Sequence, residues 1–167
     1  MKTLIDVLNL CFTIHEGVNR KWDNKTPYAV HPMWCAMMFL QETSFPPGVD
    51  REQCALALLL HDGPEDTGLP LPDWVPLKVI ELVKQMTFTS QPGSTAIERK
   101  EIWVRDPLVR LLKLYDKTSN LLDGSWMPAA KRNEEYVPYI LELAKDVENN
   151  FGNLNIVKIA RAIAIPV

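Results

Sequence analysis

Apolar residues recur at intervals of three and four along most of this chain, which is the spacing of one face of an α-helix. No stretch shows the strict alternation of apolar and polar residues that is typical of a half-buried strand. We therefore expect an all-α fold, with 1–167 forming a single domain. The pattern predicts helices over 2–20, 32–42, 51–62, 77–88, 106–123, 131–148 and 154–165.

Prolines and polar residues separate these helices. We expect loops over 19–31 and over 89–100, the second reading "TSQPGSTAIERK". Asp50 is a predicted N-cap for the third helix, and Gly63 and Pro64 are predicted to end it after Asp62.

Composition and charge narrow the class of protein. Hydrophobic residues make up 47% of the chain and charged residues 23%, with a net charge of −3 and no basic run. We therefore expect a folded cytoplasmic protein that neither binds a nucleic-acid duplex nor spans a membrane. The cysteines, Cys11, Cys35 and Cys54, lie far apart in the sequence, which favours reduced core thiols over disulfides.

One carboxylate stands out because it falls in an apolar stripe. The stripe runs from Leu108 to Leu122, and Asp116 lies four residues after Leu112 on the same helix. A buried carboxylate is costly unless it is paired or bound to a metal. Its partner could be a neighbouring arginine, such as Arg110 or Arg132, or a metal ion.

Two of the three histidines lie at predicted helix boundaries beside apolar segments. They are His31 and His61, and Asp62 follows His61 directly. A lone histidine is more often a hydrogen-bonded core residue, and Asp62 alone could simply end a helix. In combination with Asp116, however, their imidazole nitrogens and carboxylate oxygens suit Mn²⁺, Fe²⁺ or Zn²⁺. The candidate metal ligands are His31, His61, Asp62 and Asp116.

Several motifs contain these residues in a recognisable order. They read "HEGVNRKWDNKTPYAVHP", "LALLLHDGPEDTG", "LLKLYDKTSNLLD" and "KRNEEYV". Together they resemble the HD-superfamily metal-dependent phosphohydrolases, over about 15–136. Within that superfamily the chain is most similar to the hydrolase domain of stringent-response enzymes that degrade (p)ppGpp, including the small stand-alone forms.

The resemblance implies an HD-type helical bundle that holds one divalent ion, Mn²⁺ by preference, with Fe²⁺, Zn²⁺, Co²⁺ or Mg²⁺ as alternatives. It implies that Glu65 and Asp66 act on the attacking water. For Arg20 and Lys21 an exposed basic dipeptide is an almost equally good interpretation. The residues implied to contact substrate are Arg20, Lys21, Lys117, Asn120 and Tyr136.

The chain departs from the family at two places. Gly63 and Pro64 stand between the His-Asp and Glu-Asp pairs, where the family usually has aliphatic or hydroxyl residues. The segment "QMTFTSQPG", 85–93, lacks the basic contact that the family places there.

The predicted function is therefore hydrolysis of a small-molecule nucleotide, in particular removal of the 3′-pyrophosphate of (p)ppGpp. The alternatives are phosphohydrolysis of a dNTP, a nucleoside monophosphate or NADPH, and a non-catalytic nucleotide-binding module. The oligomeric state stays open.

Overall fold

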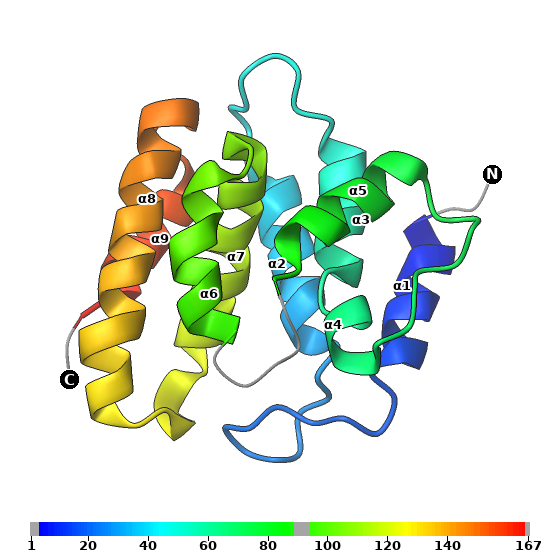
Figure 1. The fold of residues 1–167 in the computed structure, drawn as a ribbon, viewed down its shortest axis with the longest axis horizontal. Helices are drawn as coiled ribbons and strands as arrows, with labels where there is room; N and C mark the ends of the chain where they lie inside the picture. Colours follow the sequence, from blue (N-terminus) through cyan, green and yellow to red (C-terminus); the bar gives the residue numbers. More distant parts are fainter. Residues whose placement is uncertain (1–3, 89–93, 166–167) are drawn as a thin grey trace.

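The computed structural model describes residues 4–88 and 94–165, and every regular element within these ranges is helical (Figure 1). The predicted all-α class is confirmed. Within the same ranges, no helix has both the length and the apolar character needed to span a membrane. The elements are α1 (Leu4–Ile14), α2 (Val30–Gln41), α3 (Arg51–Leu60), α4 (Gly63–Thr67), α5 (Leu77–Met86), α6 (Ser94–Glu101), η1 (Ile102–Val104), α7 (Pro107–Leu122), η2 (Gly124–Trp126), η3 (Lys131–Tyr136), α8 (Val137–Phe151) and α9 (Asn155–Ile163).

Helix α7 joins the two sides of the bundle. It packs against α8 and α9 and also against α2, and Figure 1 shows α8 and α9 on the opposite side of the molecule from α1, α3 and α5. Asp106 caps its N-terminus by accepting a hydrogen bond from Leu108 N. Tyr115 on its predicted apolar stripe is fully buried, whereas Leu122 at the end of the stripe is exposed. The stripe therefore ends one turn earlier than the sequence predicts.

Helix α3 is buried on all sides, because it packs against α1, α2 and α5. Every residue from Cys54 to Leu60 is buried, and the predicted N-cap Asp50 accepts a hydrogen bond from Gln53 N at 3.1 Å. Such a helix holds its C-terminal end rigidly in the protein interior. The cysteines, Cys11, Cys35 and Cys54, are free and buried, as predicted.

The end of α3 differs from the prediction. The helix ends at Leu60 rather than Asp62, and Gly63 and Pro64 begin α4 instead of ending α3. Proline suits the first turn of a helix because the missing N–H has no intrahelical partner there. A Cβ atom on Gly63 would lie 3.1 Å from Ile14 Cδ1, so glycine allows α1 and α4 to approach closely.

The segment 89–100 was predicted as a loop, and this prediction is wrong over its described part, because α6 begins at Ser94. Residues 89–93, which include most of the segment that departs from the family, lie outside the described residues. Farther along the chain, a π-helical turn over Lys131–Tyr136 leads into α8. Pro138 lies in the first turn of α8.

Candidate functional site

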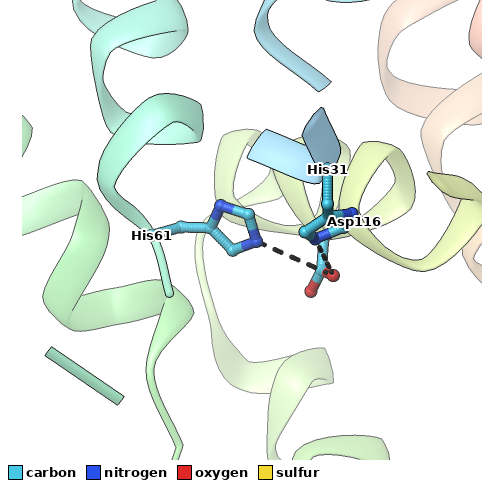
Figure 2. Close-up of side chains that lie close together, drawn as sticks. All are labelled: His31, His61 and Asp116. Atoms are coloured by element: carbon cyan, nitrogen blue, oxygen red, sulfur yellow. Dashed lines mark ion pairs between the residues drawn. The ribbon is translucent and has the colours of Figure 1, made fainter. Parts of the chain in front are cut away.

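Three side chains from distant parts of the sequence meet in the protein interior (Figure 2). His31 lies in the first turn of α2, His61 follows α3, and Asp116 lies on α7. Each offers one ligand atom, and these atoms lie within 4.8 Å of one another. The structure thus brings together three of the four predicted ligands in a group that could hold a divalent metal ion.

Both imidazoles are oriented through their Nδ1 atoms. His61 Nδ1 lies 2.8 Å from the carbonyl oxygen of Leu58, and His31 Nδ1 lies 2.8 Å from Ser119 Oγ. The Leu58 carbonyl can only accept, so in neutral His61 the proton is on Nδ1 and the lone pair is on Nε2. The Nε2 atoms of both histidines are buried and have no hydrogen-bond partner among the residues that the structure describes. Buried imidazole nitrogens that are oriented in this way, and that accept no hydrogen bond, are suited to bind a metal ion.

The electrostatics of this group favour a cation. Burial by itself lowers the pKa of His61, but the carboxylates of Asp62 and Asp116 raise it to about 9. The negative field that favours a proton at Nε2 favours a metal ion in the same way. The residues present therefore fit a divalent cation.

Asp62, the fourth predicted ligand, lies beside both histidines but outside the group of three. Its Oδ1 is 3.1 Å from His61 Nε2, and its Oδ2 is 3.4 Å from His31 Nε2. Although burial alone raises the pKa of Asp62, the two imidazoles lower it, so the carboxylate is ionised. The Tyr28 hydroxyl donates a 2.8 Å hydrogen bond to Asp62 Oδ2 and fixes its orientation.

Replacing Tyr28 with phenylalanine is expected to weaken divalent-metal binding about tenfold, because the substitution releases a carboxylate next to both imidazoles. The unfolding temperature should change little, since the ring and its packing are retained. Calorimetric titration of metal-free protein with Mn²⁺ measures the effect. Equal affinities of the variant and the wild type would contradict a role of Asp62 at the metal.

Asp116 is paired with lysines and not with the arginines suggested by the sequence. Its Oδ2 lies 3.0 Å from Lys113 Nζ and 3.1 Å from Lys117 Nζ. Arg110 instead pairs with Asp146 at 2.7 Å, and Arg132 donates to backbone carbonyls near the C-terminus. Burial by itself raises the pKa of Asp116, but the two ammonium groups hold it well below its ordinary value. The carboxylate is therefore ionised.

A cavity of about 280 Å³ opens beside Asp62 and Asp116. Neither candidate ligand histidine lines this cavity, but every other predicted site residue does. Its wall therefore carries carboxylates and basic groups side by side. The lining residues are Arg20, Lys21, Tyr28, Asp62, Glu65, Asp66, Thr95, Lys113, Asp116, Lys117, Asn120, Trp126, Met127, Lys131 and Tyr136.

Glu65 and Asp66 enter the cavity wall from the first turn of α4. Burial and the nearby carboxylates of Asp62 and Glu65 raise the pKa of Asp66 to about 6. Burial is also the main reason why the pKa of Glu65 is raised. Asp66 Oδ2 lies 3.6 Å from Nδ1 of the buried His15. Acids with raised pKa values are suited to accepting and returning a proton near neutral pH.

The predicted substrate contacts Arg20, Lys21 and Asn120 already contact other side chains of the protein. The Arg20 guanidinium donates two hydrogen bonds to Asp123, at 2.6 and 2.8 Å, and one to Asn120 Oδ1 at 2.9 Å. Asn120 in turn donates to Asp116 Oδ1 at 2.7 Å. Lys21 Nζ lies 4.8 Å from the centre of the Trp126 ring. Arg20 and Asn120 thus connect the cavity wall to the candidate metal ligand Asp116.

Sequence reasoning missed Tyr28, Lys113 and Glu98. The first two stand inside the quoted motifs, as the Tyr of "PYAVHP" and the first Lys of "KLYDK", so a signal was present. Glu98 lies on α6, in a segment predicted as a loop, and its carboxylate contacts the amines of both lysines that pair with Asp116. Nothing in its sequence context indicates this contact.

Comparison with known proteins adds a likeness of fold. No family model matches the chain, and no curated protein matches it in sequence. A solved structure described as "A metazoan ortholog of SpoT hydrolyzes ppGpp and plays a role in starvation responses" superposes on it with a TM-score of 0.77. The two share 19% sequence identity, and the superposition covers 98% of this chain and 95% of the other. The chain therefore shares the helical fold of that structure, in agreement with the predicted helical bundle.

Proposed function

We propose that this chain is a metal-dependent nucleotide phosphohydrolase, and in particular a guanosine-3′,5′-bis(diphosphate) 3′-pyrophosphohydrolase. The observation that carries the proposal is the group of His31, His61 and Asp116, whose imidazole Nε2 atoms have no hydrogen-bond partner among the described residues, beside a cavity that has both acidic and basic walls. The likeness of fold to a protein described as hydrolysing ppGpp supports the choice of substrate.

In this proposal His31, His61, Asp62 and Asp116 hold one divalent ion, with Mn²⁺ as our choice. When bound, such an ion activates water and offsets negative charge on a phosphate. The protein fixes the ligands beforehand, through Ser119 behind His31, the Leu58 carbonyl behind His61 and Tyr28 on Asp62. Little reorganisation is then needed when substrate enters.

Glu65 and Asp66 are proposed to orient the attacking water and to take up its proton. Water attacks the phosphorus that is bonded to the 3′ oxygen, and the bond between this phosphorus and the 3′ oxygen breaks. The 3′ oxygen takes up a proton, which leaves GDP or GTP together with pyrophosphate. The raised pKa of Asp66 suits this exchange of protons.

Basic and aromatic groups provide the proposed contacts to substrate. Lys21, Lys117 and Arg20 line the cavity and would offset the charge of a diphosphate, and Asn120 and Tyr136 would contact the ribose and its phosphates. Arg20 also borders a second cavity, of about 320 Å³, whose wall includes Trp22 and Trp34. Aromatic walls of this kind suit a purine base.

The proposal is tested by incubating Mn²⁺-loaded protein with ppGpp, GTP, a dNTP, a nucleoside monophosphate and NADPH, with products identified by mass spectrometry. We expect GDP and pyrophosphate from ppGpp, and little turnover of nucleotides that lack a 3′ diphosphate. The Asp62→Ala variant is the control for contaminating activity.

The panel also separates the alternatives. Turnover of a dNTP, a monophosphate or NADPH but not of ppGpp would keep the reaction class and change the substrate. Nucleotide binding without any turnover would favour a non-catalytic binding module, and ppGpp turnover no greater than that of Asp62→Ala would refute the proposed activity.

A further inference from the structure

The two oxygens of Asp116 face different surroundings. Oδ1 faces the Nε2 atoms of the two candidate ligand histidines, at 3.4 and 3.7 Å, and accepts a 2.7 Å hydrogen bond from Asn120. Oδ2 faces two ammonium groups, of Lys113 at 3.0 Å and of Lys117 at 3.1 Å. Asp116 thus offers one oxygen to a cation site while the other neutralises positive charge. A cation can bind Oδ1 only if both ammonium groups remain at Oδ2.

Two ammonium groups next to a candidate metal ligand would oppose the binding of a cation. Each ammonium has three N–H donors, and a single carboxylate cannot neutralise two positive charges. With only Asp116 to pair with, Lys113 and Lys117 would gain by covering both of its oxygens. They would also leave one excess positive charge in a buried region, which repels a divalent cation.

Glu98 provides the missing negative charge on the far side of the lysines. Its Oε2 lies 3.3 Å from Lys113 Nζ and 3.0 Å from Lys117 Nζ. Its Oε1 accepts a 2.9 Å hydrogen bond from the Tyr139 hydroxyl, which fixes the carboxylate in place. Glu98 is 5% exposed, and Lys113 and Asp116 are each 2% exposed, so solvent screens these charges weakly.

We propose that Glu98 is a positioning residue for the metal site: it holds Lys113 and Lys117 away from Oδ1 of Asp116 and balances their charge, so that Oδ1 stays available to a divalent cation beside its hydrogen bond from Asn120. The inference rests on the metal site of the proposed function. It assigns to α6 a role in building that site, although none of the candidate ligands lies on this helix.

The test is Mn²⁺ binding to metal-stripped protein, measured by calorimetric titration. Glu98→Gln keeps the size of the side chain and an acceptor for Tyr139 but removes the charge, and we expect it to raise the Kd for Mn²⁺ about tenfold or more. Glu98→Asp keeps the charge on a shorter side chain, and its Kd should lie between those of the wild type and Glu98→Gln.

A compensating variant shows whether charge balance is the reason for the expected loss of Mn²⁺ affinity. Combining Glu98→Gln with Lys113→Met removes one ammonium group and restores the charge balance around Asp116. Because metal affinity follows the balance of nearby charge, we expect the Kd for Mn²⁺ to return to within about threefold of wild type. If Glu98→Gln does not fold, this double variant and Glu98→Asp decide the question. Asp146→Asn, which breaks the Arg110 pair outside the cavity, is the matched control and should leave the Kd unchanged.

The outcomes separate this inference from the proposed function. Wild-type protein that binds no divalent metal would refute both. Wild-type binding with an unchanged Kd in Glu98→Gln, even with a lower unfolding temperature, would show that Glu98 only stabilises the fold. A double variant that binds as weakly as Glu98→Gln would also overturn the positioning role.

Discussion

The Asp116→Asn variant is expected to lose Mn²⁺ binding and about 1000-fold of the hydrolytic rate, because the neutral amide is a poor replacement for an anionic ligand. The fold should also lose about 3 kcal/mol of stability, since the substitution leaves the buried Lys113 and Lys117 with an uncompensated charge. Metal content, turnover of ppGpp and urea unfolding measure these effects.

Two further variants separate the loss of metal from the loss of stability. His61→Gln removes a candidate ligand but leaves the lysine pairing intact, so it should lose metal binding with a smaller loss of stability. Asp146→Asn breaks an ion pair of similar length that lies outside the cavity, and it should retain both metal and activity. Wild-type metal affinity in Asp116→Asn would contradict the assigned site.

The sequence predicts those parts of the site that local patterns determine. Asp116 is recognisable because helical spacing places a carboxylate in an apolar stripe, and it is indeed buried on α7. His61 is recognisable because it ends a run of apolar residues, Cys54 to Leu60, that are all buried in α3. For Asp116, helical periodicity indicates which side of the helix faces the interior, whereas for His61 the unbroken apolar run indicates a helix that is buried on all sides.

Parts that depend on contacts between distant segments were missed. The sequence "STAIERKE" of α6 has almost no apolar periodicity. In the structure its Ile97 is 40% exposed, and the side chain that it buries is the charged Glu98. Short isolated helices are marginal, and this one is supported by contacts of Glu98 with lysines of α7 and with Tyr139. No local pattern reveals such partners.

The Gly63-Pro64 pair shows how one local signal allows two outcomes. Proline excludes a continuous helix through its own position, but it also suits the first turn of a new helix. The packing of Ile14 against Gly63 accompanies the second outcome. As a result Glu65 and Asp66 lie in the first turn of α4, and Asp66 N donates to the carbonyl oxygen of Asp62 at 2.8 Å. The two acids are therefore closer to the candidate ligands in structure than an open loop would place them.

The second large effect is expected for Asp66→Asn, which should lower kcat about 100-fold while the Kd for Mn²⁺ stays within about threefold of wild type. The amide cannot accept a proton, but it keeps the shape of the side chain. Asp73→Asn, which removes an exposed acid that lines no described cavity, is the matched control and should behave like the wild type. Steady-state kinetics with ppGpp and calorimetry with Mn²⁺ give the two values. A parallel loss of metal affinity would instead make Asp66 a metal ligand.

Combining Asp66→Asn with Glu65→Gln shows how the two acids share the work. If both act on one water molecule, the double variant should lose hardly more activity than the more damaging single variant, because groups that act as a unit are not additive. Independent roles would multiply the two losses. The positions of both acids in the first turn of α4, one residue apart and beside Asp62, favour a shared water. A fully multiplicative loss would therefore assign one of them to substrate binding.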